Sequence, residues 1–372
     1  MQQVCIVDAQ AVCSLGDNLD EIWKSLYIGK TAIKPVTRFE TKNYTSNLAA
    51  CINDLKASNN NSLIHSLLEK LFKNLNDIPK DPFILTASTK SGIDNLELIR
   101  KNKDADYNDL FLFNLPHIVS NKLGLPVSGI NISAACASST IAAIYAYEMI
   151  AFGQISSAVI CFIDIVTEFV FSGFSSLKAL SKKGANPFDK NRDGLTIGEG
   201  AGIIILMSEE RAKKEGRKIL AKIIGSGIAN DATHVTAPAK DGCGLIYAIK
   251  KGLDRAILNP KEIDAISAHG TGTVYNDKME LTAFENVFKD IKIPIHSVKG
   301  AIGHTLGAAG GIEIAIGVKT ILNQTVPPTC NLIDPEYDFI FNKPIEIPIK
   351  YLLKTNSGFG GINAALILAR NQ

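Results

Sequence analysis

Short apolar runs alternate along the chain with longer segments that suit helices. Runs compatible with buried strands lie at residues 4–7, 83–87, 127–133, 158–163, 198–207, 220–228, 263–269, 293–298 and 364–368. Helix-compatible segments lie between many of them, at residues 17–26, 62–74, 140–150, 242–258, 278–288 and 307–322. Because strands that alternate with helices form parallel sheets with helical layers, the pattern predicts an α/β protein built on parallel sheets.

The first and second parts of this pattern are alike. Each part contains a strand that runs into a loop holding a candidate catalytic residue, although the two parts share no obvious sequence identity. We therefore expect an internal pseudo-repeat of two halves, residues 1–222 and residues 223–372.

Composition narrows the possible functions. The 372 residues are 46% hydrophobic and carry a formal net charge of +2, which does not indicate a general nucleic-acid binder. The seven cysteines show no Cys-x-x-Cys pair and no zinc-ligand spacing, which favours a reducing compartment and no metal site. No signal peptide is visible, and the longest apolar runs are too short to span a bilayer. We therefore expect a cytoplasmic protein without a membrane span.

Cys136 lies where the predicted strand at 127–133 turns into the predicted helix at 140–150, among alanines and serines. Small neighbours would let a substrate approach the sulfur. The N-terminus of a helix offers unpaired N–H groups and the positive end of a dipole, which favour thiolate over thiol. This is the setting of a nucleophilic cysteine, although a free cysteine in an apolar setting is more often a core residue.

A histidine stands at the end of the predicted strand at 263–269. His269 is followed by Gly-Thr-Gly-Thr, so that Thr271 and Thr273 can hydrogen-bond a polar ligand. A plain strand-end turn with a satisfied histidine is the alternative interpretation.

A second histidine belongs to a stretch rich in glycine and alanine. Between Lys299 and Glu313 the chain combines lysine, His304 and glutamate with small residues that favour close packing. Charges packed in this way would be buried together, and buried charges must pair or shift their pKa. The alternative, a solvated turn with chance charges, fits the apolar flanks poorly.

A glycine-rich turn near the end of the chain surrounds one aromatic residue. Phe359 stands in Ser-Gly-Phe-Gly-Gly, where the glycines would let it swing and would expose backbone N–H groups. Such a turn can supply an oxyanion donor. A tight β-turn between two strands is the simpler interpretation.

These residues together suit one reaction. A cysteine thiolate can accept an acyl group from a thioester. Two neutral imidazoles, from His269 and His304, can donate hydrogen bonds to the oxygen of an enolate that forms when a malonyl carboxylate leaves as carbon dioxide. The enolate carbon then attacks the acyl-cysteine. This chemistry needs no metal and no redox cofactor.

The four stretches, taken together, resemble the elongating β-ketoacyl-acyl-carrier-protein synthases, which are ketosynthases of the thiolase-like superfamily that work in fatty-acid and polyketide assembly. Supporting stretches are residues 29–40, 186–193, 198–202 and 230–238. The compact chain is more similar to an enzyme of a specialised polyketide or aryl-polyene pathway than to the housekeeping synthase.

The resemblance implies a thiolase-like fold with five layers, α-β-α-β-α, and an acyltransferase that carries out decarboxylative Claisen condensation with malonyl-acyl carrier protein. Cys136 would be the nucleophile, and His269 and His304 would promote decarboxylation. Lys299 and Glu313 would form an ion pair that orients His304. The N–H groups of Cys136 and Phe359 would form the oxyanion hole, with Phe359 as a gate. The residues that would bind the phosphopantetheine arm or the acyl chain are Thr271, Thr273, Phe174 and His234.

The resemblance also implies the partners. An acyl carrier protein would bring the substrates on its phosphopantetheine arm, with Lys30, Arg38 and Lys178 as candidate contacts, and no other cofactor would be needed. The enzyme would be a homodimer, or a heterodimer with another ketosynthase-like subunit.

The chain departs from the family pattern in three places. Asn186 stands where an arginine is common. The segment before Cys136 is shorter than in typical members, and the usual Asn-Ser-Phe before Gly-Phe-Gly-Gly is here Thr355-Asn-Ser357. The alternatives to an active ketosynthase are the chain-length subunit of a heterodimeric complex, a thiolase or starter-unit synthase, and a cysteine hydrolase. The cysteine argues against the first, the two histidines against the second, and the lack of a peptide- or ester-binding context against the third.

Overall fold

One long sheet with two similar halves runs through the protein. In the computed structural model, which describes residues 1–57, 60–75, 77–126 and 129–371, the strand order is β11-β10-β14-β15-β9-β1-β8-β6-β4-β5. The first half consists of β1 (Val4–Cys13), β4 (Phe83–Ala87), β5 (Gly129–Ile132), β6 (Ser157–Asp164) and β8 (Gly200–Ser208). The second half consists of β9 (Ala221–Asn230), β10 (Ala265–Ser267), β11 (Ile295–His296), β14 (Tyr351–Gly358) and β15 (Ile362–Ala369).

The two halves have the same topology. From β1 outward the pairings are antiparallel to β8, antiparallel to β6, parallel to β4 and parallel to β5. From β9 outward, the pairings to β15, β14, β10 and β11 follow the same sequence of directions. The predicted pseudo-repeat is therefore confirmed. The halves join where β1 pairs with β9, so the predicted boundary at residues 222 and 223 lies inside β9.

The prediction of parallel sheets is wrong for the centre of each half. Strands β8 and β15 pair antiparallel on both sides. Both strands are buried almost throughout, so their side chains are apolar on both faces, as in a parallel sheet. Composition alone therefore does not reveal the direction of these strands.

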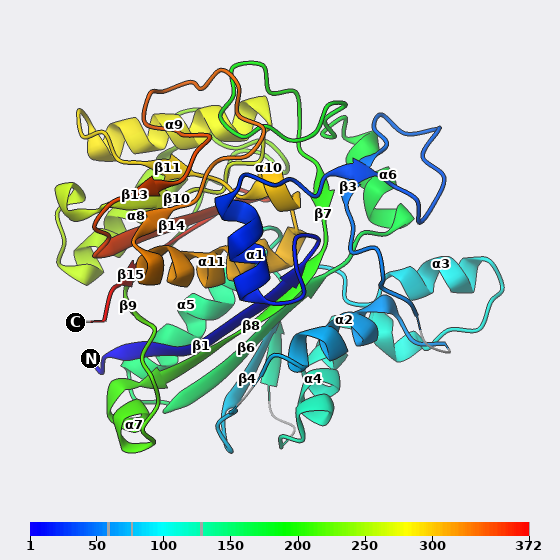
Figure 1. Cartoon of the computed structure of the whole chain (residues 1–372). Helices are drawn as coiled ribbons and strands as arrows, with labels where there is room; N and C mark the ends of the chain where they lie inside the picture. The colour runs from blue at the N-terminus through cyan, green and yellow to red at the C-terminus, as the bar shows by residue number, and fades with distance from the viewer. Residues whose placement is uncertain (58–59, 76, 127–128, 372) are drawn as a thin grey trace.

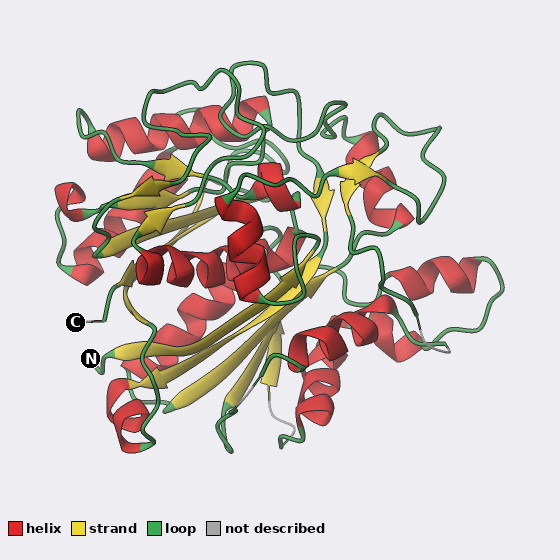
Figure 2. Ribbon diagram, viewed as in Figure 1, coloured by secondary structure: helices red, strands yellow, loops and turns green. Residues whose placement is uncertain are grey.

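Helices lie on both sides of each half-sheet and form the five layers that the resemblance predicted (Figures 1 and 2). The middle layer contains α5 (Ser138–Ala151) and α11 (Ala309–Asn323), which contact each other and both half-sheets. One outer layer contains α2 (Leu63–Phe72), α4 (Leu115–Leu123) and α7 (Glu209–Lys214), and the other contains α8 (Cys243–Ala256) and α9 (Val274–Phe288).

The remaining elements are short. They are helices α1 (Leu19–Tyr27), α3 (Asp94–Arg100), α6 (Glu168–Ser176) and α10 (Lys299–Ile302), strands β2 (Lys34–Pro35), β3 (Leu48–Ala50), β7 (Ile197–Gly198), β12 (Thr325–Val326) and β13 (Ile345–Glu346), and the 3₁₀ turns η1 (Tyr107–Leu110), η2 (Leu112–Asn114), η3 (Pro260–Glu262) and η4 (Leu306–Ala308).

Helix α11 belongs to the one stretch of the described residues, Leu306–Asn323, that is long and apolar enough by composition to cross a membrane. Glu313 and Lys319 interrupt this stretch, so its individual apolar runs are short, as the sequence predicted. In addition, 83% of this stretch is buried inside the protein, because α11 is packed between the two half-sheets. A central core helix needs the same apolar composition as a membrane span.

The strand before Cys136 is less buried than its apolar residues predicted. Strand β5 forms the edge of the first half, and Ile130 is 41% exposed. Close to this strand, Phe111 and Phe113 are 47% and 71% exposed, and their rings stack 5.3 Å apart. Val127, which the sequence assigned to this strand, lies outside the described residues. Apolar residues on an exposed edge need a covering surface.

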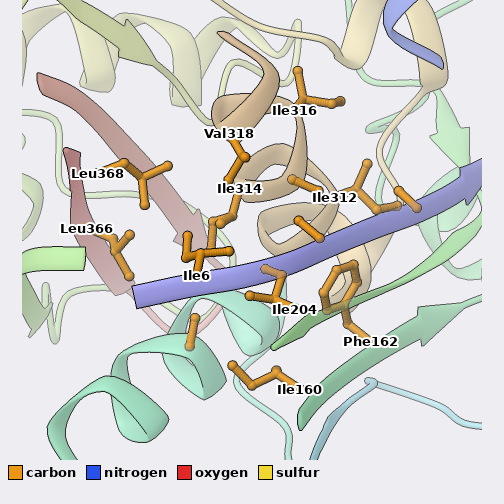
Figure 3. Close-up of a cluster of buried hydrophobic side chains, with 14 of the residues drawn as sticks. Ile6, Ile160, Phe162, Ile204, Ile312, Ile314, Ile316, Val318, Leu366 and Leu368 are labelled. Atoms are coloured by element: carbon orange, nitrogen blue, oxygen red, sulfur yellow. The ribbon is translucent and has the colours of Figure 1, made fainter. Parts of the chain in front are cut away.

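Phe162 is the one aromatic side chain labelled among the aliphatic residues of the buried cluster in Figure 3. Phe162 of β6 is fully buried between Gly202 of β8 and Gly311 of α11. A methyl group added at Gly311 would lie 2.4 Å from the Phe162 ring. The glycine is therefore what allows α11 to approach the sheet at this point.

We expect Gly311→Ala to lower the free energy of unfolding by up to about 2 kcal/mol. Overpacking against Phe162 costs about 1–3 kcal/mol, and the higher helix propensity of alanine offsets about 1 kcal/mol of that. In a Phe162→Leu background the clash is relieved, so the same substitution should become neutral or stabilising. Urea unfolding of the wild type, the two single variants and the double variant measures the coupling between residues 311 and 162. An equal effect of Gly311→Ala in both backgrounds would contradict the packing.

Candidate active site

Cys136 occupies a tight turn between β5 and α5. The preceding residue, Ala135, has a positive φ of 48°, and the Cys136 side chain is 9% exposed. The β14–β15 hairpin passes directly against this turn, since a methyl group at Gly358 would lie 3.1 Å from the Cys136 backbone nitrogen. Close approach of Phe359 to the nucleophile therefore depends on the small residues on both sides.

Two histidines from the second half lie beside the cysteine. His269 follows β10 and His304 follows α10. The Cys136 sulfur and one ring nitrogen from each histidine all lie within 4.8 Å of one another, and the two rings are 5.2 Å apart and nearly perpendicular. The backbone of His304 is fixed by its bonds to Thr196 and Gly198. The structure thus brings together the three residues that the sequence predicted.

The hydrogen bonds of both rings determine which nitrogen carries the proton. The Leu306 N–H donates to Nδ1 of His304 over 3.2 Å. Nδ1 of His269 faces two donors, Nδ2 of Asn356 at 3.0 Å and Nζ of Lys299 at 3.3 Å. A neutral imidazole that accepts at Nδ1 carries its proton on Nε2. Both rings therefore present an Nε2–H group, and Nε2 of His304 has no partner among the described residues.

Both imidazoles are neutral at ordinary pH. Burial and the nearby Lys299 charge lower the pKa of His304 to about 3, although Glu313 opposes the shift. Burial, followed by Lys299, lowers the pKa of His269 well below its usual value. Neutral imidazoles donate hydrogen bonds here without adding charge, as the proposed decarboxylation chemistry requires.

A buried cluster of charges lies behind His269. Lys299 pairs with Glu313 and also donates to the backbone carbonyl of His269. Nζ of Lys354 lies 2.8 Å from the other oxygen of Glu313. Burial would raise the pKa of Glu313, but the two lysines outweigh it and lower that pKa to about 2. Lys299 contacts His269 directly, whereas Glu313 is linked to His269 through Lys299 and Asn356. Among the described residues neither side chain hydrogen-bonds His304, so the prediction that this pair orients His304 needs correction.

A cavity of about 340 Å³ opens onto these groups. Thr271 and Thr273 line it, with their hydroxyl oxygens 2.9 Å apart. Phe174 and Phe359 also line it and stack at 6.0 Å. His234 does not line the cavity: its Nδ1 accepts hydrogen bonds from the backbone of the next residues, which themselves line it. The loop that follows His234 therefore lines the cavity, and a binding role for His234 itself stays a prediction.

The loop with the two threonines is held by acidic side chains of α9. Asp277 accepts backbone N–H bonds from Thr271 and Gly272, and Glu280 accepts them from His269 and Gly270. These hydrogen bonds fix the backbone of the loop against α9. The side chains of Thr271 and Thr273 line the cavity.

The same three side chains that form the site are close enough to hold a metal ion. A metal bound at Nε2 would require the proton to move to Nδ1, and a bound histidine normally donates that proton to an acceptor. Here Nδ1 of each ring faces N–H donors instead. The donor pattern therefore favours hydrogen-bond catalysis over metal binding.

Two buried residues of β14, Lys354 and Asn356, were not among the site residues predicted from the sequence. The sequence around Lys354 does not indicate that this lysine pairs with the buried Glu313 of α11. The sequence also listed Arg38 as a surface contact, whereas its guanidinium pairs with the buried Glu199 at 2.6 Å. Lys178, in contrast, is exposed and lines the cavity.

Comparisons with known proteins agree with this geometry. The family model "Beta-ketoacyl synthase, N-terminal domain" matches residues 113–212, and "Beta-ketoacyl synthase, C-terminal domain" matches residues 220–333. The 3-oxoacyl-[acyl-carrier-protein] synthase 2 of Coxiella burnetii is 31% identical over 412 residues, which cover 99% of each chain.

Two solved structures resemble the whole chain. "The ishigamide ketosynthase/chain length factor" has a TM-score of 0.90 and 27% identity, with all of both chains covered. A ketosynthase in complex with its type II acyl-carrier protein, AntDE:AntF, has a TM-score of 0.86 and 28% identity, again over all of both chains.

The fold and the Cys-His-His site define a condensing enzyme of the thiolase-like class. The chain belongs to the β-ketoacyl synthase family. The resemblance to ketosynthases found in the sequence is thereby confirmed.

The ionisation of Cys136 gives a test of the site. Burial raises the pKa of its thiol to about 11, although Lys299 and Lys90 lower it. This opposes the expectation that the start of α5 favours the thiolate. Because only the thiolate reacts with iodoacetamide, we expect the alkylation rate of Cys136 to rise about tenfold per pH unit from pH 7 to 9.5.

The rate is measured at Cys136 by peptide mass spectrometry, with the exposed Cys243 as an internal comparison. A plateau of the Cys136 rate below pH 8 would contradict a buried, protonated thiol and would restore the helix-dipole explanation.

Proposed function

We propose that Cys136, His269 and His304 catalyse the decarboxylative condensation of an acyl thioester with malonyl-acyl carrier protein to give a β-ketoacyl-acyl carrier protein. The observation that carries this proposal is the meeting of one thiol and two Nε2–H donors in a single cavity. A nucleophile that stores the acyl group and two donors for an enolate oxygen are what this reaction needs.

In the first step the Cys136 sulfur attacks the acyl thioester. A bond forms between the sulfur and the acyl carbon, the bond to the carrier thiol breaks, and the thiol proton ends on the departing carrier sulfur. Backbone N–H groups of Cys136 and Phe359 are suited to hold the oxyanion, since the Gly358 backbone lies against the cysteine turn.

In the second step a malonyl thioester occupies the cavity, where its carbonyl oxygen accepts hydrogen bonds from Nε2 of His269 and His304. The carboxylate leaves as carbon dioxide, and the electron pair of the broken C–C bond forms the enolate. The enolate carbon attacks the acyl-cysteine, and the sulfur leaves as a thiolate that takes up a proton. Since both rings are neutral donors, they stabilise the enolate by hydrogen bonds and protonate it less readily than an imidazolium would.

The carrier protein is the natural source of both thioesters. Thr271 and Thr273 offer hydroxyl groups along the cavity for a phosphopantetheine arm, and the exposed Lys178 lies at the cavity for an acidic carrier protein. No other cofactor takes part in these steps. All seven cysteines are free thiols, which supports a cytoplasmic location.

The working enzyme is a dimer formed through the edge of the first half-sheet. Strand β5 ends the strand order of the described residues, and Ile130, Phe111 and Phe113 expose apolar surface near it. An unpaired edge of this kind is a template for a second strand. The partner is a second copy, or a related chain-length subunit as in the ishigamide ketosynthase/chain length factor. In the latter case this chain is the cysteine-bearing subunit.

Removal of the nucleophile tests the first step. We expect Cys136→Ala to abolish covalent acylation by an acyl-carrier thioester, as seen by intact-protein mass spectrometry. Cys243→Ala, which removes an exposed cysteine, should be acylated like the wild type. Replacement of His269 or His304 by alanine should leave acylation intact and reduce carbon dioxide release from malonyl-carrier by about 10²–10³-fold, because each removes one enolate donor. Acylation of Cys136→Ala would contradict the assignment.

The dimer surface has its own test. We expect Ile130→Lys to convert a dimer into a monomer, since it places a charge on the apolar edge strand. Light scattering after size-exclusion chromatography gives the mass directly. The control is Ile257→Lys, at a residue that is 90% exposed at the end of the outer helix α8. An unchanged mass of the Ile130 variant would place the interface elsewhere.

A further inference from the structure

Strand β14 sends two polar side chains beneath the active site. Lys354 and Asn356 are two positions apart, so they point to the same face of the strand, and both are fully buried. That face looks toward Glu313 of α11. Polar side chains buried this deeply lower the stability of the fold unless they are fully paired. The hydrogen-bond partners of Lys354 and Asn356 therefore indicate the role of each residue.

The amide of Asn356 can adopt only one orientation. Its Oδ1 accepts a hydrogen bond from the hydroxyl of Thr140, which belongs to α5. Its Nδ2 lies 3.0 Å from an oxygen of Glu313. Because Glu313 is ionised, it can only accept hydrogen bonds. A flipped amide would place its oxygen against that carboxylate and is therefore excluded.

This orientation points a donor at His269. Nδ2 of Asn356 is 3.0 Å from Nδ1 of the ring, and its second proton is free for that bond. Lys299 is a second donor to the same nitrogen at 3.3 Å, but its Nζ also serves Glu313 and the backbone of His269. A ring nitrogen that faces two donors keeps its lone pair, so the proton resides on the other nitrogen.

Lys354 maintains the charge on which this arrangement depends. Its Nζ lies 2.8 Å from the same Glu313 oxygen that Asn356 contacts and 3.2 Å from the carbonyl of Ser267. The second lysine keeps Glu313 ionised within a buried site. With two lysines and one glutamate the cluster carries one net positive charge, which favours an anion forming in the cavity.

We propose that Asn356 is a positioning residue, held by Thr140 and by a Glu313 that Lys354 keeps ionised, which fixes His269 in the tautomer that presents Nε2–H to the substrate. This rests on the proposed role of His269 as an enolate donor. The usual family pattern has a serine at the position of Asn356. The positioning of His269 by an asparagine side chain is therefore a feature of strand β14 in this chain.

The tautomer is measured directly by ¹⁵N NMR of histidine-labelled protein, with the His269 signals assigned from their loss in His269→Gln. In the wild type we expect Nδ1 to be unprotonated and Nε2 protonated at pH 7. Asn356→Asp puts an oxygen in place of Nδ2. Beside Glu313 the new carboxyl shares one proton with that carboxylate and has none left to donate to His269, so we expect Nδ1 to gain a proton. A wild-type spectrum with the proton on Nδ1, or an unchanged His269 spectrum in Asn356→Asp, would overturn the proposal.

Catalysis provides the second readout. With the wrong nitrogen protonated, Asn356→Asp should release carbon dioxide from malonyl-carrier with a kcat about 10²–10³-fold lower and a nearly unchanged KM. Acylation of Cys136 should persist in this variant. The control is Asn95→Asp, which also puts a carboxylate at a fully buried asparagine but lies in α3 and bonds only residues outside the site. It should lower stability and leave the His269 spectrum unchanged.

The experiments distinguish failure of the proposed condensation function from failure of the positioning role of Asn356. If the wild type neither acylates Cys136 nor releases carbon dioxide, the proposed function is wrong, and the NMR still reports the tautomer. If the wild type is active but the kcat of Asn356→Asp is within twofold of it, Asn356 does not position His269.

Discussion

The buried ion cluster behind His269 is the constraint on which the rest of the site depends. Lys299 and Lys354 both bind Glu313, and all three side chains are almost completely buried. Burial of charges costs free energy unless every charge is paired and hydrogen-bonded. The cluster meets this condition and in doing so supplies donors to the imidazole, keeps it neutral and sets the direction of its proton.

The pseudo-repeat explains why the catalytic groups meet. In each half the chain leaves the outermost strand, β5 or β11, makes a turn and enters a helix of the middle layer. Cys136 lies in the first turn, and Lys299 and His304 lie in the second. Since α5 and α11 pack side by side between the half-sheets, residues more than a hundred positions apart converge on one cavity.

Much of the site could be predicted from local sequence, and the remainder depends on contacts through space. Cys136 and His269 were found because each follows a predicted strand, and His304 was found because it stands in a stretch rich in glycine and alanine. Lys354 and Asn356 were not among the predicted site residues because their role comes from α5 and α11, which no spacing within β14 reveals. The direction of β8 was missed because a strand buried on both faces has no alternation. The exposure of β5 was missed because an apolar run in the sequence does not reveal which strand forms the edge of the sheet.

The central claim is that both imidazoles are neutral and point Nε2–H into the cavity. Neutron diffraction from deuterium-exchanged crystals of the wild-type protein tests it most directly, because it locates each ring proton. The account predicts deuterium on Nε2 of both His269 and His304 and none on either Nδ1. Deuterium on Nδ1 of either ring, or on both nitrogens of one ring, would contradict it.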